Sequence, residues 1–272
     1  MTTWIIPITK LLSTFSLICS IMRNAIITIV KLVLYYFAYQ LSFSVVAMGL
    51  KFLFASLDMI TMTSLAMVAS TLMMSWHLIH FDYVRLANDR YKEVKLPVLA
   101  VAIVFIFAAM YVLNLFIEQA GIPNTLEETF IAMSRNPFGV LSIALLAPIL
   151  EELLFRGAIQ GVLLRAQDKP WIAILISSLI FGVVHMNPAQ IPFAFLLGMM
   201  FGWLYYRTGS LLPGIVGHVL NNSVAAVNMI LYGNTTIEEQ IENPLTMWVW
   251  AVVAVATCYV AVLWLDKNLE RQ

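Results

Sequence analysis

Two adjacent glutamates and an arginine interrupt the apolar stretch "LLAPILEELLFRGAIQG", residues 145–161. The carboxylates of Glu151 and Glu152 could act as general bases or coordinate a metal ion. Arg156 lies four residues after Glu152, so on a helix the two side chains share a face and could neutralise each other. Glu151 points about 100° away from Glu152 on a helix and therefore needs another partner. Pro148 lacks a backbone N–H and predicts a kink beside Glu151.

Histidines and an amide follow at helical spacing in two later apolar segments. His185 ends the sequence "FGVVH", four residues after Phe181, and His218 lies four residues before Asn222. A carboxylate assisted by an imidazole can activate water, while another imidazole and an amide stabilise an oxyanion. The same groups could hold a metal ion with an open position for water, in which case we expect Glu151, His185 and His218 as ligands.

The predicted depths of these groups in a membrane differ. Counted from Arg165 and Pro170 at the predicted inner surface, Glu151 and His185 both lie roughly 21–23 Å along their helices. They are therefore expected to meet. His218 lies only about 10 Å along its own helix by the same count, which requires that helix to be tilted or longer.

The composition predicts a membrane protein. The chain has 272 residues, of which 61% are hydrophobic and 11% are charged, whereas an ordinary soluble domain is about 25% charged. A formal net charge of zero gives no basic field for nucleic acid. The two cysteines, Cys19 and Cys258, lie far apart in apolar contexts and indicate neither a disulfide framework nor a metal site. The sequence also contains no G-x-S-x-G and no H-E-x-x-H motif.

Charged residues and Pro/Gly clusters divide the chain into about eight candidate spans of roughly 20 residues each. These are 28–50, 54–81, 96–117, 137–164, 170–187, 190–206, 211–232 and 245–265. Short breaks between spans four and seven favour antiparallel neighbours. The expected fold is an all-α polytopic transmembrane helical bundle, with a catalytic core formed by spans four to seven.

Four regions follow from this division. They are an N-terminal interfacial or weak anchor segment (1–27), N-terminal transmembrane helices (28–136), the catalytic transmembrane core (137–232), and an outer loop with the last transmembrane helix and a cytoplasmic tail (233–272). Residues 1–27 lack a basic n-region and a small-residue cleavage site, so a removed signal peptide is not expected.

The distribution of charge predicts an orientation. If the N-terminus is cytoplasmic, most of the fifteen Lys and Arg residues fall on the inner side. The outer loops then carry acidic pairs, Glu127 with Glu128 and Glu238 with Glu239. We expect a multi-pass protein of the bacterial cytoplasmic (inner) membrane with both termini inside.

Three motifs in this order, E-E-x-x-x-R (151–156), F-x-x-x-H (181–185) and H-x-x-x-N (218–222), resemble the CPBP family. That family comprises the CAAX prenyl proteases and Abi-like bacterial relatives linked to bacteriocin processing and self-immunity. The resemblance covers about residues 137–232. It implies an intramembrane endopeptidase that hydrolyses a peptide bond of a membrane-associated protein or peptide.

The resemblance also implies roles for the motif residues. Glu151 resembles the base that activates water, with help from His185. His218 and Asn222 resemble the oxyanion stabilisers, and Glu152 with Arg156 an orienting pair. Family members are described both as metalloproteases and as metal-independent glutamic proteases, so the expected cofactor is either none or zinc.

Two other functions remain possible from the sequence. Glutamate and histidine in membrane helices also serve proton-coupled transporters, although the polar residues here cluster in one half of the chain and transporters often have two related halves. A non-proteolytic family member could bind a peptide in an immunity-type role. The G-x-x-x-G spacings of Gly157 with Gly161 and Gly198 with Gly202 are interpreted as close helix packing.

Overall fold

The computed structural model describes residues 8–54, 56–84, 94–233, 235–241 and 243–269, and every regular element within these ranges is a helix. In chain order, with η marking π-helical segments, the elements are α1 (Ile8–Lys51), α2 (Met59–His80), α3 (Leu96–Gln119), α4 (Glu127–Ser134), α5 (Pro137–Val140), η1 (Leu141–Leu146), α6 (Ala147–Glu151), η2 (Glu152–Gln160), α7 (Gly161–Ala166), α8 (Pro170–Val183), α9 (Gln190–Thr208), α10 (Leu212–Tyr232), α11 (Ile237–Gln240) and α12 (Pro244–Asn268). The expected all-α helical bundle is confirmed.

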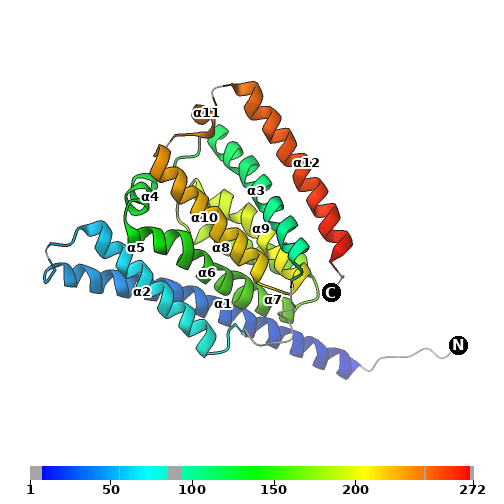
Figure 1. Ribbon diagram of the computed structural model, residues 1–272. Helices are drawn as coiled ribbons and strands as arrows, with labels where there is room; N and C mark the ends of the chain where they lie inside the picture. The colour runs from blue at the N-terminus through cyan, green and yellow to red at the C-terminus, as the bar shows by residue number, and fades with distance from the viewer. Residues whose placement is uncertain (1–7, 55, 85–93, 234, 242, 270–272) are drawn as a thin grey trace.

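The segments α5 to α7 form one rod that crosses the middle of the bundle (Figure 1). The α1–α2 pair packs on one side of this rod, and α8, α9 and α10 pack on the other. Helices α3 and α12 lie along each other at the edge of the molecule, with α3 also in contact with α9 and α10. The rod therefore has protein neighbours on both sides, which allows it to carry buried polar groups.

Within the described residues, six helices are long and apolar enough to cross a membrane: Cys19–Lys51, Met59–His80, Leu96–Gln119, Pro137–Ala166, Leu212–Tyr232 and Pro244–Asn268. The other two expected spans exist as α8 and α9, which pack against each other. Helix α8 has 14 residues, or about 21 Å of helix, less than the roughly 30 Å of a hydrocarbon core. Each expected span thus corresponds to a helix in the described part of the chain, and six of these helices are long and apolar enough to cross a membrane.

Helix α1 runs without a break from Ile8 to Lys51, so no helix boundary separates the proposed 1–27 segment from the first span. Residues 1–7 of that segment lie outside the described residues. A single hydrophobic cluster joins Leu32 of α1 and Leu78 of α2 to Leu154 and Phe155 of η2. The N-terminal helices and the predicted catalytic core therefore share one packed interior.

The kink expected at Pro148 takes the form of a change in helix type. Pro148 lies in α6, between the π-helical segments η1 and η2. The nitrogen of Pro148 carries no hydrogen, so the hydrogen bond to the preceding helical turn is missing. Single π-helical turns interrupt α-helices most often at functional sites. The rod thus changes its winding on either side of Glu151.

A small polar network fixes where α2 and the rod begin. Asp58 caps α2 by accepting a hydrogen bond from the Thr61 amide at 2.9 Å. The Thr61 hydroxyl also donates to the Asp58 carboxyl, at 2.7 Å. The two hydrogen bonds from Thr61 hold the pKa of that carboxyl below its ordinary value. Asn136, which caps α5, donates its side-chain amide to the Thr61 hydroxyl at 2.7 Å. The start of α2 is thereby tied to the start of the rod.

Candidate active site

The π-helical segment η2 carries the charged residues of the first motif. All of its residues are buried, and the side chains of Glu152 and Arg156 are each only 1% exposed. Arg156 Nη1 lies 3.0 Å from Glu152 Oε1, so the pairing that the spacing predicts is present. A buried ion pair is tolerated when further contacts offset the cost of removing both charges from water.

Two aromatic rings supply such contacts to Arg156. The guanidinium carbon lies 4.4 Å from the centroid of Phe181 in α8 and 5.3 Å from that of Phe201 in α9. A cation over a desolvated aromatic face gains about 2 kcal/mol or more. Both rings are buried, so Arg156 is held by α8 and α9 as well as by Glu152.

His218 of α10 bridges the two glutamates. Its Nδ1 lies 3.1 Å from Glu152 Oε1, and its Nε2 lies 3.5 Å from Glu151 Oε2. An ionised carboxylate only accepts hydrogen bonds, so a doubly protonated ring satisfies both contacts. In that state the two carboxylates balance the charges of His218 and Arg156. The Glu151 side chain is 13% exposed, which makes it the accessible carboxylate of the pair.

These contacts give Glu151 a partner in His218, which the depth count had placed only about 10 Å along its own helix. The expected approach of His185 to Glu151 stays a prediction. The depth count assumed that the turn between α9 and α10 lies at the membrane surface. In the structure Thr208, Ser210 and Leu211 of that turn are all buried. This turn is therefore covered by other parts of the protein, and His218 lies within contact distance of both glutamates.

His185 lies just beyond the end of α8, where its Nδ1 is 2.7 Å from the Phe181 carbonyl oxygen. A carbonyl only accepts, so Nδ1 donates in this contact, and Nε2 is the ring nitrogen that points away from it. The Phe181 ring contacts the rings of both His185 and His218, at centroid distances of 5.0 Å and 5.9 Å. Within the described ranges, no hydrogen bond or ion pair joins His185 to either glutamate.

Asn222 lies one turn after His218, as expected, but its amide is engaged elsewhere. Its Nδ2 donates to the Ile143 carbonyl of η1 at 3.0 Å, and its Oδ1 accepts from Asn221 at 2.7 Å. These bonds hold α10 against the rod. An oxyanion-stabilising role for Asn222 stays a prediction.

The candidate metal ligands do not converge in this structure. Both nitrogens of His218 face carboxylates, and among the described residues no hydrogen bond or ion pair joins His185 to Glu151 or Glu152. Among the residues that the structure describes, no group of three or more His, Cys, Asp or Glu side chains could hold a metal ion. The set of Glu151, His185 and His218 does not fit a metal in this arrangement, so we derive no step through one.

Gln160 is a buried polar residue that the sequence analysis did not single out. It is fully buried, and its Nε2 donates to the Gly202 carbonyl of α9 at 2.8 Å. Glu152, Arg156 and Gln160 follow one another at intervals of four residues, and we call these three residues the polar row. This regular spacing was available in the sequence, but glutamine carries no charge that would mark it as unusual in an apolar helix.

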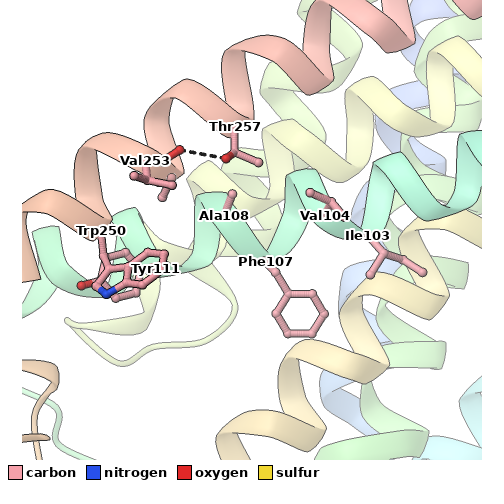
Figure 2. A pocket seen from close by; sticks show the side chains of 9 residues that line it. Ile103, Val104, Phe107, Ala108, Tyr111, Trp250, Val253 and Thr257 are labelled. Carbon is pink, nitrogen blue, oxygen red and sulfur yellow. Dashed lines mark hydrogen bonds between the residues drawn. The ribbon is translucent and has the colours of Figure 1, made fainter. Parts of the chain in front are cut away.

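An open groove lies away from the polar row. It has a volume of about 390 Å³ and lies between α3 and α12. Figure 2 shows Trp250, Val253 and Thr257 of α12 on one side and Val104, Ala108 and Tyr111 of α3 on the other. The Thr257 hydroxyl donates to the Val253 carbonyl at 2.8 Å, within its own helix. The groove is apolar and contains none of the candidate site residues.

Together, the fold and the site define a polytopic helical membrane protein with a buried glutamate–arginine–histidine cluster. Residues 134–224 match the family model described as type II CAAX prenyl endopeptidase Rce1-like. The resemblance to the CPBP family is therefore confirmed over the segment that contains all three motifs.

Two curated relatives match a similar share of the chain. "Membrane-embedded CAAX protease MroQ" of Staphylococcus aureus (strain USA300) is 32% identical over 114 residues, which are 40% of this chain and 46% of the relative. "Putative membrane peptidase YdiL" of Bacillus subtilis (strain 168) is 31% identical over 104 residues, 38% of this chain and 42% of the relative. The chain thus spans less than half the length of these relatives. No solved structure matches it significantly.

Proposed function

We propose that this protein is an intramembrane endopeptidase that hydrolyses a peptide bond of a membrane-associated protein or peptide. One observation carries the proposal: His218 bridges a fully buried glutamate paired with Arg156 and a second glutamate that remains partly accessible. This arrangement keeps one carboxylate available for chemistry while the other is fixed. The names of the two relatives, a CAAX protease and a membrane peptidase, support the same class of reaction.

In the proposed reaction Glu151 accepts a proton from a water molecule as the water oxygen attacks the peptide carbonyl carbon. A tetrahedral intermediate forms, the C–N bond then breaks, and the proton passes from Glu151 to the leaving amine. Glu151 suits this role because its carboxylate is more exposed than that of Glu152. A general base contributes about 10²–10⁴-fold to a rate.

His218 is proposed to stabilise the oxyanion of that intermediate. Its contact with Glu152 is the shorter one, 3.1 Å against 3.5 Å to Glu151. With the ring held in place through Nδ1, Nε2–H is the donor proposed to contact a substrate oxygen beside Glu151. The Glu152–Arg156 pair orients the ring, and Nε2 of His185 assists the transfer of the proton. Asn222 is proposed as the second oxyanion donor, through the other N–H of its amide.

Metal independence is the first expected result. Because the candidate ligands do not converge, purified protein in detergent should cleave peptides equally well before and after exhaustive chelation. Metal content is measured on the same samples by mass spectrometry, with a peptide that carries a fluorophore and a quencher as the probe. Loss of cleavage on chelation, with recovery on adding Zn²⁺, would contradict this form of the mechanism.

The orientation in a bacterial cytoplasmic membrane, with both termini inside, is proposed from the distribution of Lys and Arg. A reporter enzyme that is active only in the cytoplasm, fused after Gln272, should therefore be active. The matched control places the same reporter after Gly121, in the loop between α3 and α4, where it should be silent. The opposite pattern of activity would overturn the orientation.

A further inference from the structure

Three glycines of α9 and α10 face the polar row, one against each of its side chains. The pairs are Gly214 with Glu152, Gly198 with Arg156 and Gly202 with Gln160. A Cβ atom added at these glycines would lie 2.6 Å, 3.2 Å and 2.7 Å, respectively, from a polar side-chain atom of the row. The Gly198–Gly202 spacing thus makes room for polar side chains, which refines its interpretation as simple helix packing.

Gly214 makes the most specific of these contacts. The three atoms nearest to its added Cβ all belong to Glu152: Oε2 at 2.6 Å, Cδ at 3.3 Å and Cγ at 3.7 Å. At Gly198 and Gly202, by contrast, side-chain carbon atoms of α8 also lie close to the added atom. Carbon and oxygen atoms that are not bonded do not approach within 3.0 Å, so a side chain at position 214 requires the Glu152 carboxylate or α10 to shift.

The backbone gives no other reason for glycine at this position. Gly214 lies in the first turn of α10, and its φ is not among the positive values of the chain. Inside a helix glycine is less favourable than alanine, because it loses more conformational freedom on folding. The close approach of the Glu152 side chain is therefore the feature of the structure that explains a glycine at position 214.

Displacing this carboxylate would disturb the rest of the site. The other oxygen, Glu152 Oε1, contacts both Arg156 at 3.0 Å and His218 at 3.1 Å. The side chain is almost fully buried, so it has little room to move without losing one of these contacts. His218 in turn contacts Glu151. A change at position 214 is therefore expected to alter the position of the Glu151 carboxylate through the side chains of Glu152 and His218.

We propose that Gly214 is a positioning residue for the reaction: by lacking a side chain it sets the position of the Glu152 carboxylate and, through it, the orientation of His218. This inference rests on the proposed peptidase function. It assigns to α10 a second functional position, four residues before His218, that no motif marks.

The kinetic test compares Gly214→Ala with Gly49→Ala. The added methyl group at position 49 of α1 meets no atom within 4 Å, so it serves as a matched control. We expect Gly214→Ala to lower kcat for peptide cleavage by about 10–100-fold with little change in KM, because small displacements of catalytic groups have effects of that size. Gly49→Ala should keep wild-type kinetics. Wild-type kcat in Gly214→Ala would overturn the proposal.

A second test needs no activity. In a Glu152→Gln background the amide fills the same space as the carboxylate, so adding Gly214→Ala should lower the melting temperature in detergent by a few degrees. In a Glu152→Asp background the side chain is one methylene shorter. There, adding Gly214→Ala should lower the melting temperature by clearly less. An equal loss in both backgrounds would overturn the placement of Glu152 against Gly214. If the expected difference appears but the wild type cleaves no peptide, the proposed function fails while the contact stands.

Discussion

Replacing Arg156 by alanine should destabilise the protein by about 3–5 kcal/mol, the usual cost of removing one partner from a buried ion pair. Glu152 would keep a carboxylate that is 1% exposed and has lost its guanidinium at 3.0 Å. The faces of Phe181 and Phe201 would lose their cation as well. The free energy of unfolding can be measured by titration with denaturant in mixed micelles.

The ion pair between Arg207 and Asp266 provides the control. The Asp266 side chain is 49% exposed, and exposed pairs contribute about 0–1 kcal/mol. Asp266→Ala should therefore cost far less than Arg156→Ala. The loss of stability in Arg156→Lys should lie between those of Arg156→Ala and Asp266→Ala. Lysine keeps the charge but lacks the flat guanidinium that lies against the two rings. Equal costs for Arg156→Ala and Asp266→Ala would contradict the importance assigned to the buried pair.

Replacing Glu151 by glutamine should reduce peptide cleavage by about 10²–10⁴-fold, because an amide cannot accept the proton of the attacking water. The melting temperature should change little. The side chain is partly exposed, its contact with His218 is long at 3.5 Å, and glutamine can still accept a hydrogen bond there. Glu152→Gln should instead lower both activity and stability, since it removes the charge that Arg156 faces. Parallel measurements of kcat and melting temperature separate the two roles.

The pair of Glu152 and Arg156 could be predicted from the sequence because it depends only on local spacing. Residues four apart lie side by side on a helix whatever the rest of the fold does. The existence of the main helices was predictable for a similar reason, since long apolar stretches have few alternatives in a membrane.

The partner of Glu151 could not be predicted in this way. The depth of His218 was counted from a turn that was assumed to meet water, but the turn at Thr208, Ser210 and Leu211 is buried. Burial of that turn depends on how α9 and α10 pack against the rod, which no local pattern records. The same holds for Gly214, whose importance depends on the position of a side chain sixty-two residues earlier in the sequence.

The matching family segment, residues 134–224, is also not the whole of the structural unit. Leu32 of α1 and Leu78 of α2 are fully buried in the same cluster as Phe155 of η2. From the sequence, these helices were expected only as membrane spans. Their packing indicates that truncating α1 and α2 would expose the face of η2 that lies opposite α8 and α9.

The most direct test of the central claim is cleavage of a membrane peptide library by purified wild-type protein and by Glu151→Gln, each reconstituted in liposomes and followed by mass spectrometry. We expect defined cleavage products with the wild type and at least about a hundredfold less of the same products with Glu151→Gln. The two preparations should have equal thermal stability. Equal product formation by the two proteins would contradict Glu151 as the base, and the absence of any product with the wild type would contradict the proposed peptidase.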